Sequence, residues 1–350
     1  MKNLTALEIC AGGGGQALGL ELAGFSHAAV VEIDQAACST LRANRPSWNV
    51  IECDLHVFDG KAYKGVDLLA GGVPCPPFSV AGKQLGAEDE RDLFPEALRL
   101  VREINPRAVM LENVKGLAAA KFATYREGIL RQLEALGYRS AWRIVNACDF
   151  GVPQLRPRFI LIALQKKYAN SFAWPIRQHS PPTVGQTLIG MMDSRGWPGA
   201  KEWAKSASGI GPTIVGGSKK HGGPDLGPTR ARLQWAQLRV NGSSLANEAP
   251  GADFPIDGLP KLTVEMAARI QGFPDSWRFI GKKTSAYRQV GNAFPPPVAS
   301  ALGGAIARAL SGESAPVALD LGLSGLPLIE LMERGKQLGR QSQAILQPQS

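Results

Sequence analysis

The sequence lacks a run of about 18 uninterrupted apolar residues, has no closely paired cysteines, and contains few histidines. The missing apolar run argues against a membrane-spanning helix. Its five cysteines are scattered without a C-x-x-C pair and its four histidines are equally dispersed, which argues against a disulfide framework and a zinc site. From these scattered residues we expect a protein that needs no metal. The N-terminal residues MKNLTALEIC run into a strand pattern and show no signal peptide, so we expect the protein to be cytoplasmic.

Acidic residues are fewer than basic ones. The chain has 30 Asp and Glu against 39 Lys and Arg, a formal net charge of +9 and a pI near 9.4. Such a balance favours a polyanionic partner, of which nucleic acid is the commonest. Solubility alone is the competing explanation. At 350 residues the chain exceeds what one hydrophobic core usually fills, so we expect two domains.

Strand and helix patterns alternate through the first half of the chain. Apolar runs predict strands at 4–10, 28–33, 50–53, 66–70, 108–111, 143–146 and 159–164. Helical periodicity predicts helices at 17–23, 35–43, 95–104 and 125–136. This order is typical of an α/β fold with a doubly wound, mostly parallel sheet covered on both faces. Ligands of such sheets bind at the carboxyl ends of the strands.

The composition changes after about residue 180. Residues 181–260 are rich in Gly, Pro, Ser and basic residues, with Trp197, Trp203 and Trp235 among only brief periodic stretches. These features predict a second, smaller and irregular domain. Regular patterns return at 262–270 and at 297–310, which is predicted to be a helix after a proline-rich turn.

Glycines and acidic residues follow the first three predicted strands. The glycine-rich run at 11–15 opens a helix, where a ligand can approach the backbone closely. Glu32 ends the second strand about 20 residues after Gly12, the spacing at which a carboxylate meets ribose hydroxyls. Asp54 ends the third strand. Together these residues predict an adenosine-containing cofactor, and both NAD and S-adenosylmethionine fit this pattern.

A cysteine and a glutamate follow the next two strands. Cys75 stands on a turn between prolines, and Pro76 and Pro77 keep it out of the interior of a strand or helix. Glu112 ends the neighbouring strand, so the thiol and the carboxyl group are predicted to face one crevice. A nucleophile and its acid are one interpretation. The alternatives are an incidental thiol on a turn and an acid that balances a helix dipole.

Several short strings in this order resemble the signature blocks of the C5-cytosine DNA methyltransferases. They are GGVPCPPFS at 71–79, ENV at 112–114, QLRPR at 154–158, QVGNA at 289–293, the blocks at 11–15, 32 and 54, and LTVE to QGFP at 262–274. The resemblance spans residues 4–300. Three features depart from the family pattern: Glu8 replaces Asp, the glycine run is longer, and Pro76 replaces the frequent Gln.

The resemblance implies a Rossmann-like fold that uses S-adenosylmethionine, and a mechanism. The thiolate of Cys75 would add to C6 of cytosine and make C5 electron-rich. Glu112, with a raised pKa, would supply a proton or hydrogen bond at N3. Arg158, with Arg156, would donate to O2 and to a neighbouring phosphate. The base that removes the C5 proton is not assigned.

The resemblance also implies a set of cofactor-binding residues. The glycine-rich loop would meet the methionine end, Glu32 the ribose, Asp54 with Leu55 the adenine, and Leu93 with Asn292 the closing wall. A simple turn is the alternative for Asn292. The predicted set is Ala11, Gly12, Gly13, Gly14, Gly15, Glu32, Ile33, Asp54, Leu55, Pro74, Leu93, Asn292 and Ala293.

Duplex DNA is the implied partner. A paired cytosine must be flipped out before it can react, and we expect the polar loop at 80–94 to close over it as a lid, an ordinary surface loop being the alternative. Basic residues in glycine-rich or helical surroundings suit a DNA groove, although each one also fits a solvated basic face. The predicted DNA-binding residues are Ser79, Lys83, Gln84, Lys219, Lys220, Arg230 and Arg232.

The implied domains are a catalytic and cofactor-binding domain at 1–180, completed by 283–312, a target-recognition domain at 181–282, and a tail at 313–350. The implied function is that of a monomeric bacterial modification methyltransferase that works at the nucleoid, with a cognate restriction endonuclease as a genetic partner only. Three alternatives stay open here: a tRNA methyltransferase, a homologue that only binds DNA, and an NAD-dependent oxidoreductase.

Overall fold

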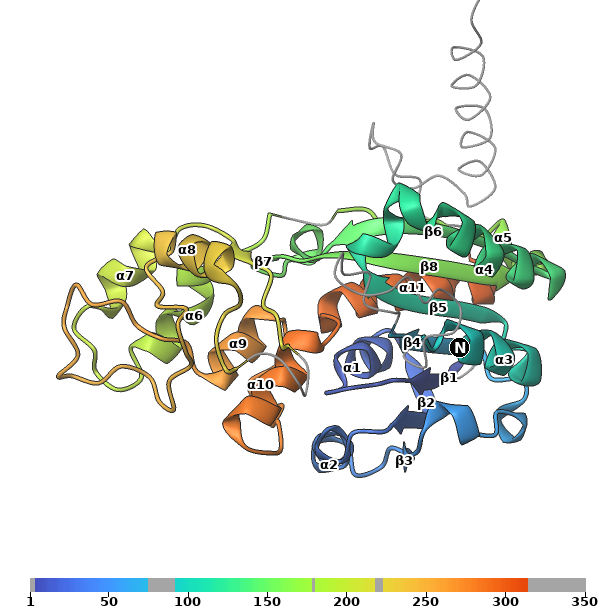
Figure 1. Ribbon diagram of the computed structural model, residues 1–350, viewed down its shortest axis with the longest axis horizontal. Helices are drawn as coiled ribbons and strands as arrows, with labels where there is room; N and C mark the ends of the chain where they lie inside the picture. Colours follow the sequence, from blue (N-terminus) through green and yellow to red (C-terminus); the bar gives the residue numbers. More distant parts are fainter. Residues whose placement is uncertain (1–3, 75–91, 178–179, 218–222, 314–350) are drawn as a thin grey trace, which may run out of the picture.

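A computed structural model describes residues 4–74, 92–177, 180–217 and 223–313 of the chain. Figure 1 shows two lobes. The first lobe contains a sheet with helices packed against it. The name second lobe refers to the described residues of 181–282, which form mainly short helices and loops.

The first lobe is organised by a seven-stranded sheet with the order β3-β2-β1-β4-β5-β8-β6. The pairs from β3 to β5 are parallel, whereas β8 is antiparallel to both β5 and β6. The predicted doubly wound, mostly parallel sheet is confirmed. The strands are β1 (Leu4–Ile9), β2 (Phe25–Glu32), β3 (Val50–Glu52), β4 (Leu68–Gly72), β5 (Ala108–Val114), β6 (Tyr138–Asn146) and β8 (Pro157–Gln165).

Local sequence explains where several helices begin. Asp34 caps α2 by accepting hydrogen bonds from the N–H groups of Ala36 and Ala37, and Thr183 with Gln186 forms a capping box at the start of α6. The described helices are α1 (Gly15–Leu22), α2 (Gln35–Asn44), α3 (Phe94–Ile104), α4 (Ala123–Ala135), α5 (Lys166–Ala169), α6 (Val184–Met192), α7 (Ala200–Ser206), α8 (Thr229–Gln237), α9 (Val264–Ile270), α10 (Lys283–Asn292) and α11 (Pro296–Ser311).

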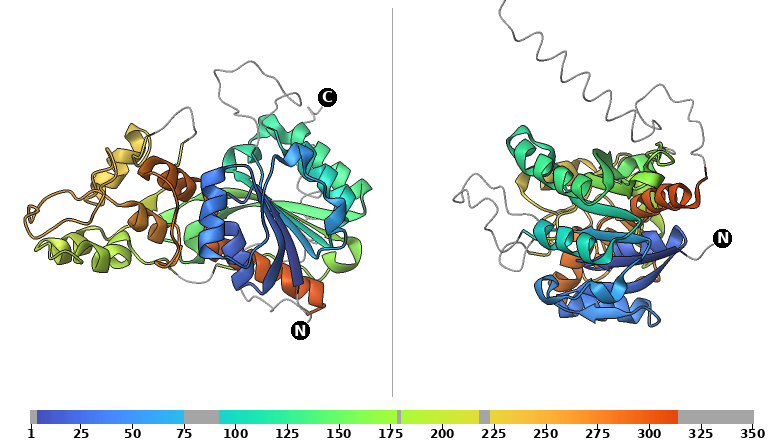
Figure 2. Two further views of the ribbon diagram at one scale, coloured as in Figure 1. Left: turned by 90° about the horizontal axis from the view of Figure 1, so that it is seen from below. Right: turned by 90° about the vertical axis from the view of Figure 1, so that its right-hand side faces the viewer.

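Helices cover both faces of the sheet (Figure 2). Side chains alternate along each strand, so Ala6 and Leu68 belong to a core that includes α11, while Leu7 and Leu69 belong to a core that includes α3 and α4. Because these strands are buried on both faces of the sheet, their sequences are continuous apolar runs.

The helix α11 follows the second lobe in the chain but packs on the first lobe, against α1. Gly19 permits this close contact, because a Cβ atom at this position would lie 2.4 Å from the carbonyl oxygen of Pro296. The packing fits the predicted return of the C-terminal helix to the catalytic domain. The domain boundaries themselves stay a prediction.

Gly19→Ala is expected to lower the free energy of unfolding by about 1–3 kcal/mol, since the added methyl group overpacks the contact between α1 and α11. Gly128→Ala is the matched control on α4, because a Cβ atom there would meet no heavy atom within 4 Å. The control should be neutral or slightly stabilising. Urea denaturation of both variants checks this, and equal stabilities would contradict the close packing.

Trp197, Trp203 and Trp235 of the second lobe are buried in a core that extends to α1 and α10. Sequence patterns predicted an irregular region here, and they missed α6, α7 and α8. A two-stranded sheet of β7 (Gln154–Leu155) and β9 (Gly211–Pro212) connects this lobe to the first. Within the described ranges, no helix is both long and apolar enough to span a bilayer.

Candidate active site

The carboxyl ends of β1 to β5 border a cavity of about 340 Å³. It lies where the strand order reverses between β1 and β4, the usual ligand site of such sheets. Its lining includes all the predicted cofactor-binding residues except Gly14 and Gly15, which continue the same loop, and also Cys10, Gln16, Asp34, Ala37, Cys53, Gly72, Glu112, Ser285, Arg288, Gln289 and Phe294. A larger cavity of about 930 Å³ lies over α1 and α11, but its described lining contains no Asp or Glu.

The glycine-rich loop between β1 and α1 forms one wall of this cavity. Gly12 and Gly14 have φ values of +55° and +86°, a left-handed conformation that favours glycine. A Cβ atom at Gly15 would lie 2.2 Å from the carbonyl oxygen of Phe294, so a side chain does not fit there. At Gly12, in contrast, no heavy atom lies within 4 Å of a built Cβ, so a ligand can approach this backbone.

The Glu32 carboxylate at the end of β2 is held by backbone groups. One oxygen accepts a hydrogen bond from the N–H of Gly12 at 2.7 Å, and the other accepts from Ile33 at 2.9 Å and Asp34 at 2.8 Å. Glu32 therefore fixes the glycine-rich loop against β2. It also contributes to the lining of the cavity, where its oxygens can accept hydrogen bonds from hydroxyl groups.

Asp54 lies at the exposed edge of the cavity, directly before a 3₁₀ turn at Leu55–Val57. Its carboxylate accepts hydrogen bonds from the backbone N–H of His56 at 3.0 Å and contacts the ring Nδ1 of His56 at 2.8 Å. The backbone hydrogen bond, together with the histidine ring, lowers the pKa of Asp54. The side chain is thus ionised and oriented beside Leu55.

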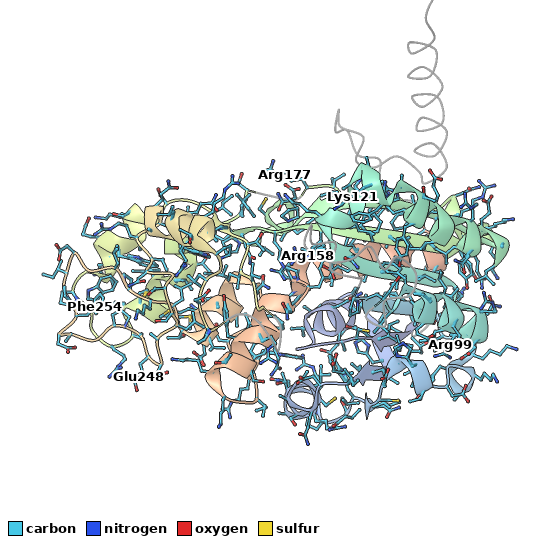
Figure 3. All side chains as sticks on the ribbon, viewed as in Figure 1. Arg99, Lys121, Arg158, Arg177, Glu248 and Phe254 are labelled. Carbon is cyan, nitrogen blue, oxygen red and sulfur yellow. The ribbon has the colours of Figure 1, made fainter. Side chains whose placement is uncertain are left out.

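Glu112 ends β5 and faces the cavity from the strand next to β4. Its Oε1 forms an ion pair with the Nε of Arg158 at 2.8 Å, and both side chains are only 13% exposed. Burial raises the pKa of Glu112, although the charge of Arg158 opposes this shift. A buried carboxyl group with a raised pKa can hold a proton and deliver it. Figure 3 places Arg158 at the end of the sheet that faces the second lobe.

The chain after β4 is anchored on both sides of the 75–91 segment. Asn113 donates a hydrogen bond from Nδ2 to the carbonyl oxygen of Val73 at 2.7 Å, and Leu93 donates its N–H to Pro74 at 3.1 Å. The predicted residues Cys75, Ser79, Lys83 and Gln84 and residues 80–91 of the predicted lid lie outside the described residues, whereas the last lid residues lead into α3, which begins at Phe94. Asn113, whose only signal in the sequence is the ENV string at 112–114, links the strand of Glu112 to the residues that precede Cys75.

The chain matches known proteins over most of its length. The model of a family described as C-5 cytosine-specific DNA methylase covers residues 4–308. The chain belongs to this family. Among curated relatives, this methylase is 56% identical to the Type II methyltransferase M.NaeI of Lentzea aerocolonigenes over 89% of its own chain and 77% of the relative. It is 53% identical to the Type II methyltransferase M.NgoMIV of Neisseria gonorrhoeae over 89% of its own chain and 99% of the relative.

Solved structures share the fold of the methylase. The Entamoeba histolytica methyltransferase EhMeth has a TM-score of 0.63 and 16% identity, covering 89% of this chain and 99% of that one. The Spodoptera frugiperda DNMT2 mutant has a TM-score of 0.60 and 19% identity, covering 87% of this chain and 99% of that one. Membership of a methylase family implies catalysis that depends on S-adenosylmethionine, which is one of the two cofactors that the glycine-rich loop left open.

In the methylase, Arg156 and Arg158 lie in different surroundings. The guanidinium group of Arg156 is fully buried and donates hydrogen bonds to the backbone carbonyls of Ile214, Gly291 and Ala293 at 2.7–2.9 Å. Burial and the neighbouring charge of Arg158 lower the pKa of Arg156. The structure therefore brings Arg158 to Glu112 and turns Arg156 to backbone groups. The contact with substrate that the sequence predicts for Arg156 does not fit this placement.

The predicted DNA-binding residues of the methylase lie on the second lobe only in part. Arg230 and Arg232 are exposed on α8, and Lys219 and Lys220 lie outside the described residues. Their contact with DNA stays a prediction. In the part of the chain that the structure describes, no group of three or more His, Cys, Asp or Glu could hold a metal ion.

Several residues of the cavity were missed by sequence reasoning. Ser285, Arg288 and Gln289 line it from α10, and Asn292 ends that helix instead of standing on a turn. The polar sequence of α10 gave no clear helical periodicity. The QVGNA string at 289–293 was the only signal for this wall.

Proposed function

We propose that this protein is the modification methyltransferase of a type II restriction-modification system, and that it methylates C5 of a flipped-out cytosine in a short duplex DNA sequence through a covalent Cys75–C6 intermediate. The names of the relatives support the system and the substrate class. The observation that carries the proposed chemistry is the buried Glu112–Arg158 pair beside the end of β4. Cys75 comes three residues after the last residue of that strand.

The cavity fits S-adenosylmethionine. Glu32 can accept hydrogen bonds from the ribose hydroxyls, while Asp54 and Leu55 can hold the adenine at the open edge. Gly12 leaves room for a ligand against the backbone, and Leu93 with Asn292 would close the wall. When bound, the cofactor supplies an electrophilic methyl group.

The residues next to this cavity support the mechanism. The Cys75 thiolate would bond to C6 while the proton of Glu112 moves to N3, which leaves a neutral ring with an electron-rich C5. Arg158 would orient Glu112 through its Nε and has further guanidinium donors for O2. After methylation, loss of the C5 proton expels the Cys75 thiolate, and return of the N3 proton to Glu112 restores the neutral aromatic ring.

Bisulfite sequencing of DNA from a methylation-free host that expresses this chain tests the proposal. We expect complete protection of one cytosine in one short sequence, and none when the host expresses Cys75→Ser. Bisulfite sequencing of tRNA from the same cells tests the alternative substrate. Methylated tRNA with unmethylated DNA would overturn the proposal. Action as a monomer in the bacterial cytoplasm, with an endonuclease encoded nearby, also belongs to the proposal.

Glu32→Gln should weaken the binding of S-adenosylhomocysteine by about 10–100-fold, as expected for the loss of hydrogen bonds to a charged group. The backbone N–H groups that now donate hydrogen bonds to the Glu32 carboxylate would also face an N–H group of the amide, which cannot accept them. Glu52→Gln is the matched control at the end of β3, because its exposed carboxylate pairs with Arg42 at the surface. Isothermal titration calorimetry checks this. Unchanged affinity in Glu32→Gln would remove Glu32 from the cofactor site.

A further inference from the structure

A buried polar network joins the two lobes beside the active site. Gln154, Arg156 and Gln271 are each fully buried. Gln154 donates from Nε2 to the Oε1 of Gln271 at 2.6 Å, and its own Oε1 accepts the N–H of Ile214 at 2.8 Å. The segment at 154–156 is therefore tied to residues that follow β9 and to residues that follow α9.

Arg156 and Gln271 hold the C-terminal end of α10. Arg156 donates from Nη2 to the carbonyls of Gly291 and Ala293 at 2.7 and 2.9 Å, while its Nη1 donates to Ile214 at 2.7 Å. Gln271 donates to Val290 at 2.8 Å and to Ala293 at 3.2 Å. A cation is favourable at a helix C-terminus, where carbonyl groups lack partners within the helix. The network thus fixes α10 and the segment after β9 to each other.

These two segments lead to different ligands. The helix α10 contributes Ser285, Arg288, Gln289 and Asn292 to the cavity proposed for S-adenosylmethionine. The segment after β9 continues through Gly216 and Gly217 into the glycine- and lysine-rich stretch at 218–223, which is predicted to contact DNA.

The two segments also touch directly. Asn292 donates from Nδ2 to the carbonyl oxygen of Gly217 at 3.2 Å. A Cβ atom at Gly291 would lie 2.3 Å from the backbone nitrogen of Gly216, so the backbones are in close contact. A shift of the second-lobe segment upon DNA binding would therefore be transmitted to the wall of the cofactor cavity.

We propose that Arg156, with Gln154 and Gln271, is a positioning network that couples DNA binding by the second lobe to cofactor binding in the first. This inference rests on the proposed function. It assigns Arg156 a role in joining segments and leaves the contact with the substrate to Arg158. Coupling of this kind is reciprocal: DNA must tighten the cofactor site by the same factor by which the cofactor tightens DNA binding.

The test measures the dissociation constant of S-adenosylhomocysteine with and without a saturating duplex that carries the sequence found by bisulfite sequencing. The wild-type ratio is expected to be at least about fivefold, the lower end of typical coupling between two sites. Arg156→Lys keeps the positive charge but cannot reach three carbonyls at once, so its ratio should fall close to one. The KM values for both substrates should rise, while kcat at saturation changes by less than about threefold.

Two further variants keep the result decisive. Gln271→Met removes the hydrogen bonds to α10 with little change in side-chain volume and should also lower the ratio. This variant tests the network if Arg156→Lys does not fold. Arg158→Lys should lower kcat and leave the ratio unchanged. A wild-type ratio of one would overturn the coupling, and a wild-type ratio in both Arg156→Lys and Gln271→Met would overturn the role of the network in it. A fall in kcat at unchanged KM in Arg156→Lys would instead indicate that Arg156 contacts the substrate directly.

The coupling and the proposed function fail in different ways. If the wild-type protein methylates no duplex DNA, the proposed function is wrong and the ratio has no meaning. If it methylates DNA while Arg156→Lys and Gln271→Met retain the wild-type ratio and KM values, only the positioning network is wrong.

Discussion

Cys75→Ser should abolish methyl transfer, with a rate at least about 10⁴-fold below that of the wild-type protein, which is the scale of loss when an enzyme loses its nucleophile. A thiol is partly ionised at neutral pH and strongly nucleophilic, whereas a serine hydroxyl at this position would need a strong base. Transfer of a tritium-labelled methyl group to the duplex measures the effect. DNA affinity, measured by fluorescence anisotropy, should stay within about threefold.

Three of the other four cysteines make poor candidates for this role. Burial raises the pKa of the Cys10 and Cys148 thiols, and burial with the nearby Glu32 carboxylate raises the pKa of Cys38 to about 12. Thiols with raised pKa values are weakly reactive. Cys148→Ser is therefore the matched control and should retain most of the activity.

A trapping experiment identifies the bond itself. With 5-fluorocytosine at the target position, no proton can leave C5, so the protein should stay attached to the duplex through Cys75. Digestion and mass spectrometry locate the attachment. Methylation by Cys75→Ser above a tenth of the wild-type rate, or attachment through another cysteine, would contradict the assignment.

The sheet could be predicted from the sequence because burial on both faces makes its strands continuous apolar runs. A polar residue at the end of such a run then marks a side chain at the carboxyl edge of the sheet, and Glu32 and Glu112 were predicted as site residues in this way. The position of β8 could not be predicted in this way. Apolar runs do not record that a later strand inserts, antiparallel, between β5 and β6.

The placement of Arg156 and Arg158 shows what a matching string leaves undecided. Both arginines belong to the QLRPR string at 154–158, so the resemblance to the methyltransferase family implied that both lie at the substrate. The chain is not a continuous strand there: β7 ends before Arg156 and β8 begins after it. The backbone N–H of Arg156 donates instead to the side chain of Asn146 at 3.0 Å. Only tertiary contacts decide where each guanidinium group lies.

The second lobe was the least predictable part. Its helices are short and its core depends on scattered tryptophans, of which Trp197 donates from its ring nitrogen to the carbonyl of Pro255 at 3.0 Å and Trp203 to that of Arg239 at 2.9 Å. Such contacts join residues far apart in the sequence. Periodicity within a short window carries no signal for them.

Glu112→Gln should lower kcat by about 10²–10⁴-fold, the usual contribution of a general acid. The amide can donate a hydrogen bond at N3 but has no carboxyl proton to deliver. Glu103→Gln is the matched control, because Glu103 on α3 also pairs with an arginine, Arg99, at 2.7 Å and has a similarly buried side chain. Single-turnover methylation measures the chemical step in both variants.

The pH dependence follows from the direction of the pKa shift. Burial raises the pKa of Glu112, and only the protonated form can deliver a proton. The wild-type rate should therefore fall as the pH rises through this pKa, while the need for a Cys75 thiolate lowers the rate at acidic pH. Glu112→Gln should lose the alkaline limb assigned to Glu112 and keep the acidic one. An unchanged alkaline limb would assign that limb to another group.

Stability provides a second readout that does not depend on activity. A carboxyl group whose pKa is raised in the folded state binds its proton more tightly there than in the unfolded chain. Its contribution to stability is complete below the unfolded pKa and is lost as the pH rises through the folded one. The stability of the wild-type protein relative to Glu112→Gln should therefore decrease from acidic to neutral pH in urea denaturation. A relative stability that increases over this range would mean that Arg158, and not burial, dominates the carboxyl group, which would then be ionised and unable to act as the acid.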